Sequence, residues 1–124
     1  MEITTSQMQG RVSVTVLQVS GTVDSSAFQD FTNAMRSAIE DGAKYLLIDI
    51  SGVPFMSSAG IRSLNEIALL LRKKFPQEKV GWTPKSTRLK LLKPSARVED
   101  VLKISGVDST LEIFDELEKA IASF

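Results

Sequence analysis

The sequence predicts a single α/β domain, in which a mostly parallel sheet of four or five strands packs against four helices. Segments with the hydrophobic period of a strand alternate four times with segments that have the period of a helix. One strand segment is apolar without interruption, as strands buried on both faces are. Parallel strands need crossover connections, which the intervening helices supply. A chain of 124 residues has the length of one domain, which we expect to span residues 1–124.

The first strand is predicted at residues 12–19, where β-branched and polar residues alternate before the phase changes. This change of phase is compatible with a β-bulge. A helix is predicted to start at Ser26, because Ser26 and Gln29 have the spacing of a capping box. Its apolar stripe ends before the Asp-Gly pair at residues 41–42.

Residues 45–48 form the uninterrupted apolar strand, which we place in the middle of the sheet. The longest helix is predicted at residues 58–75, where apolar residues repeat every three or four positions. Shorter elements follow. They are a loop at 76–87, a strand at 89–92, a helix capped by Ser95 and ended by Gly106, a strand at 111–114, and a last helix with a capping box at Asp115 and Glu118.

The composition removes most catalytic chemistry. The chain has no Cys and no His, which excludes disulfides, thiolate nucleophiles, imidazole bases and most transition-metal sites. A serine hydrolase would then need a Ser–Lys pair, and no Lys lies within ten residues of Ser58. Neither glycine-rich phosphate-binding motif is found. We therefore expect no enzymatic activity, no bound metal and no cofactor.

The charge and hydropathy of the sequence predict a cytoplasmic protein. Fifteen basic and fifteen acidic residues cancel, so direct nucleic-acid binding is not favoured. No signal-peptide pattern opens the sequence, and no apolar stretch is long enough for membrane insertion. Residues 72–94, the basic segment, nevertheless carry eight basic side chains and one acidic one. With Trp82 inside it, this segment could bind acidic partners or phosphates, although a solvated loop with a packed Trp82 is the favoured alternative.

Functional residues of parallel sheets collect at the carboxyl ends of the strands. Asp24 follows the first strand, and residues 51–60 follow the central one. Ser57 and Ser58 stand at the amino end of the longest helix, where free N–H groups and the helix dipole favour phosphate. A helix cap is the commoner reason for a Ser there. Asp24 and Asp49 could form an acidic metal site, but capping and turn contacts explain both carboxylates better.

Residues 46–60, LLIDISGVPFMSSAG, resemble the signature of the STAS domain, the family of bacterial anti-sigma factor antagonists. The family pattern is an apolar strand, Asp-x-Ser, a short linker, an aromatic residue and Asp-Ser-(Ser/Thr/Ala)-Gly. Residues 21–24, GTVD, are similar to the family's Gly-x-(Leu/Ile/Val)-Asp after its second strand. Later segments extend the resemblance over nearly the whole chain: LLKPS at 91–95, SGV at 105–107 and IFD at 113–115.

The resemblance implies a partner switch. In this family the unphosphorylated protein binds an anti-sigma factor that is also a serine kinase, and a sigma factor is released. Phosphorylation of one Ser ends that binding, and a phosphatase of the metal-dependent PP2C type restores it. The phosphorylated residue corresponds to Ser58, with Ser57 as second choice. The implied partner-binding residues are Asp24, Met56, Ser57, Ser58, Ala59, Gly60, Ile61 and Arg62.

Two departures from the family pattern leave an alternative open. Ser57 occupies the place of the motif's second Asp, which removes a carboxylate beside the predicted phosphorylation site. A scaffold without a phosphorylation cycle, as in a stressosome-like complex or a lipid-transport ATPase, is the alternative function. In addition, the loop at residues 76–87 is longer than the usual tight connection. We expect this loop to lie at the opposite end of the domain from Ser58, where it could serve a second partner.

Overall fold

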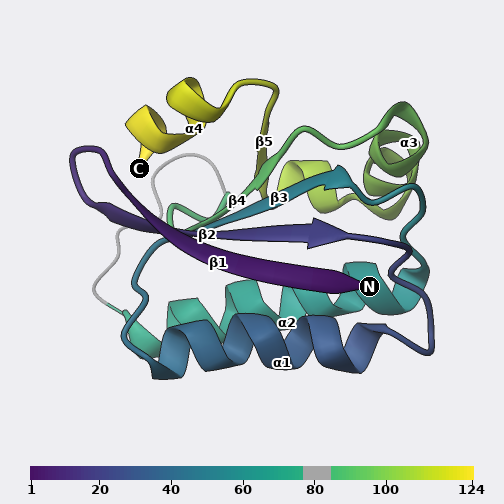
Figure 1. The fold of residues 1–124 in the computed structure, drawn as a ribbon, viewed down its shortest axis with the longest axis horizontal. Helices are drawn as coiled ribbons and strands as arrows, with labels where there is room; N and C mark the ends of the chain where they lie inside the picture. The colour runs from purple at the N-terminus through teal and green to yellow at the C-terminus, as the bar shows by residue number, and fades with distance from the viewer. Residues whose placement is uncertain (77–84) are drawn as a thin grey trace.

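A computed structural model describes residues 1–76 and 85–124, which form a five-stranded sheet with helices on both faces (Figure 1). The strands are β1 (Glu2–Gln9), β2 (Ser13–Ser20), β3 (Leu46–Gly52), β4 (Leu89–Leu92) and β5 (Glu112–Phe114). They lie side by side in chain order. β1 and β2 are antiparallel, whereas all later pairs are parallel. The sheet is therefore mixed but mostly parallel, which confirms the predicted α/β class.

The α-helices of the described residues are α1 (Phe28–Glu40), α2 (Ser58–Lys74), α3 (Ala96–Ser105) and α4 (Leu117–Ser123), with a short 3-10 helix at Val107–Ser109. α1 and α2 lie together on one face of the sheet, and α4 lies on the other (Figure 1). α3 begins and ends as predicted. The Ser95 hydroxyl accepts a hydrogen bond of 3.3 Å from the Val98 N–H, and Gly106 ends the helix with a φ of 82°.

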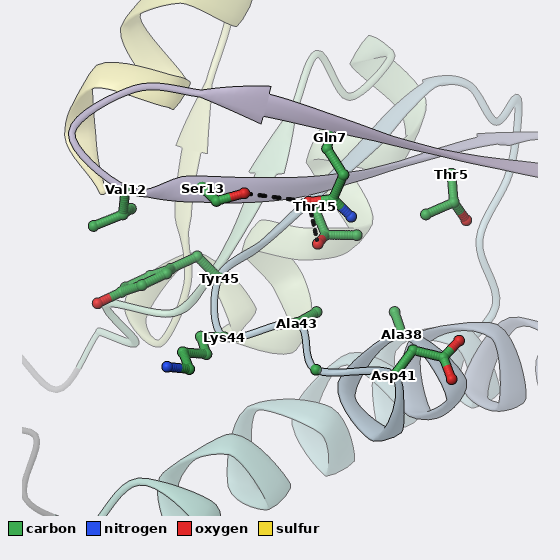
Figure 2. Close-up of a pocket in the computed structure, with 11 residues that line it drawn as sticks. Thr5, Gln7, Val12, Ser13, Thr15, Ala38, Asp41, Ala43, Lys44 and Tyr45 are labelled. Carbon is green, nitrogen blue, oxygen red and sulfur yellow. Dashed lines mark hydrogen bonds between the residues drawn. The ribbon is translucent and has the colours of Figure 1, made fainter.

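β1 is the one described strand that is not predicted from the sequence. Seven of its eight residues are exposed, and only Ile3 packs against the core, so the strand has no alternation of apolar and polar residues. Its position comes from pairing with β2. Side chains add to the pairing, since the Thr15 hydroxyl donates a hydrogen bond of 3.1 Å to Gln7 Oε1 (Figure 2).

Two predicted capping boxes do not form, and both helices begin two residues after the predicted cap. α1 starts at Phe28 rather than Ser26, because residues 25–27 make a turn that Asp24 holds. α4 starts at Leu117, and its N-cap Glu116 makes no side-chain hydrogen bond. Both segments thus have the spacing of a capping box, but the capping bonds do not form. The side chains either bond to other groups or remain in solvent.

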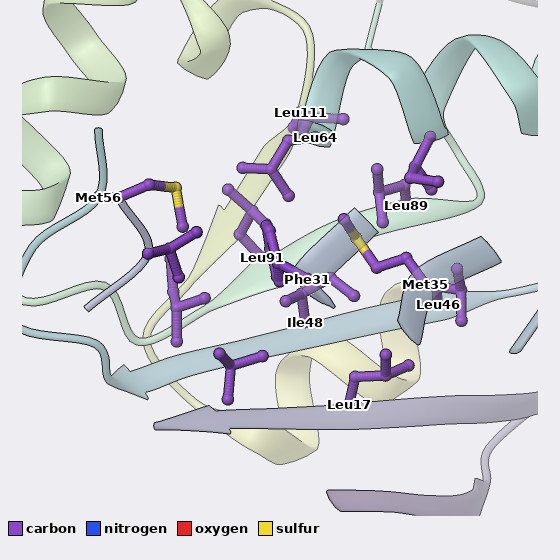
Figure 3. Close-up of a cluster of buried hydrophobic side chains, with 14 of the residues drawn as sticks. Leu17, Phe31, Met35, Leu46, Ile48, Met56, Leu64, Leu89, Leu91 and Leu111 are labelled. Carbon is purple, nitrogen blue, oxygen red and sulfur yellow. The ribbon is translucent and has the colours of Figure 1, made fainter. Parts of the chain in front are cut away.

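The sheet separates two hydrophobic cores. The larger one lies between the sheet and the helices α1, α2 and α3, and Figure 3 shows Leu17 and Ile48 of the sheet beside Phe31 and Met35 of α1. The smaller core lies beneath α4 and contains Val14, Val16, Leu47, Leu92, Ala120 and Ile121. β2 contributes to both cores, which explains why it has apolar side chains on both faces of the sheet. Its pairing with β3 is irregular between Gln18 and Ser20, as the change of phase suggests.

Most of the predicted 76–87 loop, including Trp82, lies outside the described residues. In the described end of this loop, Ser86 holds the entry to β4 by accepting hydrogen bonds from the N–H groups of Arg88 and Leu89, at 3.2 and 3.1 Å. No helix of residues 1–76 and 85–124 has the length and apolar character needed to cross a bilayer.

Candidate functional site

Two loops, one after β2 and one after β3, are joined by backbone hydrogen bonds at the carboxyl ends of these strands. The Gly21 N–H donates to the Gly52 carbonyl at 2.9 Å. Val23 then donates to the Phe55 carbonyl at 3.0 Å and accepts from the Ser57 N–H at 2.8 Å. This ladder continues the β2–β3 pairing past the end of both strands as a bridge between Val23 and Met56. It brings the turn of Asp24 next to the start of α2.

Asp24 is a structural carboxylate at the surface. Its Oδ1 accepts hydrogen bonds from the Ser26 hydroxyl at 2.7 Å, the Ser26 N–H at 2.9 Å and the Ala27 N–H at 3.1 Å. The bond from the Ser26 hydroxyl is the largest cause that lowers the pKa of Asp24 below its ordinary value, followed by the bond from the Ser26 N–H. The group is therefore a fixed negative charge at neutral pH.

Ser57 and Ser58 occupy different environments at the start of α2. Ser58 is the first helical residue and is exposed. Ser57 is the N-cap residue, and its carbonyl accepts from the Ile61 N–H at 3.1 Å. The Ser57 hydroxyl makes no capping bond, and it is buried without a hydrogen-bond partner among the described residues. Of the two hydroxyls, only that of Ser58 thus faces solvent, beside uncapped N–H groups that favour an anion.

Three of the predicted partner-binding residues lie beneath this surface rather than on it. Met56 is fully buried, Ile61 is 5% exposed, and Gly60 is buried too. A Cβ on Gly60 would stand 2.6 Å from Met56 Cγ and 2.9 Å from Val23 Cγ1, so only glycine lets α2 approach the bridge this closely. These residues support the loop. Of the other predicted residues, Ala59 is partly exposed and Arg62 is exposed.

A groove of about 270 Å³ between α1 and α2 opens beside this surface. Ala59 and Arg62 belong to its wall on α2, and Phe28 and Thr32 belong to its wall on α1. An ion pair of 3.3 Å between Arg36 and Glu66 joins the two helices at the groove. The α1 residues are not among the candidates predicted from the sequence, because only the packing of the two helices places them beside Ser58.

A larger groove, of about 720 Å³, lies elsewhere (Figure 2). It is formed by the β1–β2 hairpin, the end of α1 and the residues that lead into β3. Its wall on the hairpin includes the polar residues Thr5, Gln7, Ser13 and Thr15. Because Ser58 follows the carboxyl end of β3 and this groove borders the amino end, the two sites lie at opposite ends of the strand.

The described residues hold no group of three or more acidic side chains that could bind a metal ion. Asp49 Oδ1 accepts a hydrogen bond of 3.0 Å from the Ser51 N–H. This is the local contact expected of Asp49, but it lies inside β3, because the strand continues to Gly52.

The basic segment is not one continuous surface in the part that the structure describes. The Arg88 guanidinium lies 4.0 Å from the ring centre of Phe75 and 4.7 Å from that of Tyr45. Lys90 is only 3% exposed, and its Nζ donates to the carbonyl and hydroxyl oxygens of Ser123 at 3.0 and 2.9 Å. These two cations therefore stabilise the packing of the domain.

Comparison with known proteins gives a consistent picture. The sequence model of the STAS domain matches residues 5–77. No curated protein sequence matches the chain significantly. Among solved structures, an anti-sigma factor antagonist from Mycobacterium paratuberculosis is similar, with 24% identity, a TM-score of 0.71, and coverage of 98% of this chain and 93% of that one.

The anti-sigma factor antagonist SpoIIAA is similar in both of its forms. The unphosphorylated form has 17% identity and a TM-score of 0.63, and the match covers 96% of this chain and 93% of that one. The phosphorylated form, described as a Bacillus cell fate determinant, has 20% identity and a TM-score of 0.64, with coverage of 97% and 96%. At these identities, the similarity establishes a shared fold.

Proposed function

The chain belongs to the STAS domain family, and we propose that it is a cytoplasmic anti-sigma factor antagonist switched by phosphorylation of Ser58. In its unphosphorylated form it binds an anti-sigma factor that is also a serine kinase, and a sigma factor is released. A PP2C-type phosphatase removes the phosphate and restores binding. The protein acts by binding and carries out no catalysis of its own.

The observation that carries this proposal is the difference between two adjacent hydroxyls. Ser58 is exposed at the first position of α2, whereas the Ser57 Oγ is buried. A kinase must align the attacking hydroxyl with the γ-phosphate of ATP, and a buried hydroxyl would need local unfolding to reach it. Ser58 is therefore the acceptor, and Ser57 supports the loop.

The docking surface consists of the exposed groups around Ser58. Asp24 supplies a fixed negative charge, and Ala59 and Arg62 border the groove between α1 and α2. A phosphate on Ser58 adds nearly two negative charges, which the helix N-terminus tolerates but a closely packed partner does not. A loss of about 3 kcal/mol would weaken the complex roughly a hundredfold.

A kinase assay tests the acceptor residue. The chain and its Ser57→Ala and Ser58→Ala variants would be incubated with ATP and the anti-sigma serine kinase of the same organism, and the phosphorylated residue identified by mass spectrometry. We expect Ser57→Ala to be phosphorylated like the wild type and Ser58→Ala to remain unmodified. Phosphate on Ser57 in the Ser58→Ala variant would contradict the assignment.

A second candidate function is a STAS scaffold without a phosphorylation cycle. The observation that favours it is Ser57 itself, because the motif's carboxylate is replaced by a hydroxyl that is buried and makes no hydrogen bond among the described residues. Such a subunit would belong to a larger assembly, of the stressosome or lipid-transport ATPase type.

Pull-down from native lysate with three baits separates the two functions. The baits are the wild type, Ser58→Asp and the neutral Ser58→Asn. If the switch operates, the wild type and Ser58→Asn retain an anti-sigma serine kinase, and Ser58→Asp does not. Retention of the same proteins by all three baits would favour the scaffold.

A further inference from the structure

The edge strand β1 presents a free row of backbone hydrogen-bonding groups. It pairs with β2 over all eight of its residues, and in the described part of the chain no strand lies on its other side. Backbone N–H and C=O groups on an open strand edge are a template for a further strand. The opposite edge differs, because β5 is only three residues long.

β1 also lacks the features by which sheet edges usually prevent pairing. It contains no Pro and no Lys, and its register with β2 shows no bulge. Its only charged side chain is Glu2, at the beginning of the strand. The remaining exposed side chains are neutral.

The helix layer leaves part of this edge uncovered. Thr5 and Gln7 point toward the helix side of the sheet, where they line the groove of about 720 Å³ instead of packing on a helix (Figure 2). Toward the other end, Ile3 packs on the core and keeps the strand in place. An approaching strand thus meets an edge that Ile3 anchors to the core, with open space beneath its central part.

We propose that the β1 edge is a dimerisation surface, on which β1 of a second copy of this chain pairs antiparallel. An antiparallel pair of identical strands obeys twofold symmetry when a residue near the middle, Thr5 or Ser6, faces its own counterpart. The two sheets then join into one continuous sheet. The proposal is independent of the phosphorylation switch.

Charge complementarity favours this partner and this direction. With Ser6 on the axis, Glu2 of each copy lies opposite Gly10 of the other, next to the exposed Arg11. The Arg11 guanidinium also donates a hydrogen bond of 3.3 Å to the Ala122 carbonyl of its own chain, which holds it beside the hairpin turn. A parallel pair in register would instead set Glu2 beside Glu2. α2 follows β3, two strands away from this edge, so the dimer leaves both Ser58 residues accessible.

Sedimentation equilibrium of the full chain, up to about 500 μM, tests the proposal with two lysine variants. Ser6→Lys adds a charge within one residue of the symmetry axis, where the two copies repel each other. Gln18→Lys adds the same charge on β2, where Gln18 pairs with Thr4 and is likewise exposed, and serves as the control. We expect the wild type and Gln18→Lys to reach the mass of two chains, and Ser6→Lys to remain at the mass of one.

Hydrogen exchange of the wild type gives a readout that needs no variant. In the dimer, the outward-facing amides of β1 become protected as concentration rises, whereas amides in α2 do not change. A wild type that stays monomeric over the whole range would overturn the proposal. A dimer that persists in Ser6→Lys, or β1 protection that appears only with a different protein bound, would overturn it as well.

Discussion

The backbone N–H of Ser57 donates a hydrogen bond of 2.8 Å to the carbonyl oxygen of Val23. This single bond joins the loop after β2 to the first turn of α2, and so it links the two parts of the proposed docking surface. Because the bond belongs to the backbone, side-chain changes at Ser57 leave it in place. The loop geometry therefore depends on what packs beneath it.

Replacement of Gly60 by Ala is expected to destabilise the protein by about 1–3 kcal/mol, because the new methyl group would overlap Met56 and Val23. Urea unfolding monitored by circular dichroism measures the change. Ser58→Ala, in the same helical turn but exposed, serves as the control and should change stability little. Equal stability of wild type and Gly60→Ala would show that Met56 can move aside without cost.

We expect Asp24 to contribute to the free energy of unfolding in a way that depends on pH. Its folded-state pKa is lowered, so the contribution is complete above its ordinary pKa of 3.8 and is lost as the pH falls through the lower folded-state value. Asp24→Asn should therefore be less stable than the wild type at neutral pH, and the difference should shrink on acidification below about 3.8. Thermal unfolding over a series of pH values checks this. A difference that is independent of pH would refute the role of the ionised carboxylate.

The hydroxyl oxygens of Thr32 and Ser63 lie 2.6 Å apart in the buried contact between α1 and α2. Each also lies within hydrogen-bond distance of a carbonyl in its own helix, at Phe28 and Ala59. A double-mutant cycle with Thr32→Val and Ser63→Ala should give a coupling free energy of about 0.5–1.5 kcal/mol. Additive effects in urea unfolding would mean that the carbonyl bonds alone satisfy both hydroxyls.

We expect two substitutions of Lys90 to differ in how much they reduce the free energy of unfolding. Lys90→Ala should cost about 2–4 kcal/mol, because it leaves a cavity under α4. Lys90→Met should lower the free energy of unfolding by less, because methionine fills the space. Without the Lys90 ammonium, Ser123 Oγ keeps its bond of 2.6 Å to the Ala120 carbonyl, and the exposed part of Glu112 reaches water. Chemical unfolding of both variants compares them. A loss as large for Met as for Ala would show that the charge itself stabilises α4.

Most elements of the fold could be predicted because their signals are local. The Ser95 cap and the Gly106 stop of α3 lie within the helix they define, and both are present in the structure. The uninterrupted apolar run before Asp49 predicted a central strand, and β3 has neighbours on both sides. β1 could not be found in this way, because a polar edge strand has no period of its own and depends on β2 for its pairing.

The sequence by itself determined the order of the helices and strands from β2 onward, the family and the segment that contains the candidate site. It did so because hydrophobic period, capping residues and a contiguous motif are all properties of neighbouring positions. Only the tertiary structure separated Ser58 from Ser57, removed Met56, Gly60 and Ile61 from the surface, and added the groove between α1 and α2. Burial depends on segments that are distant in the chain, here Val23 against α2 and α1 against α2, and no local pattern specifies which atoms they cover.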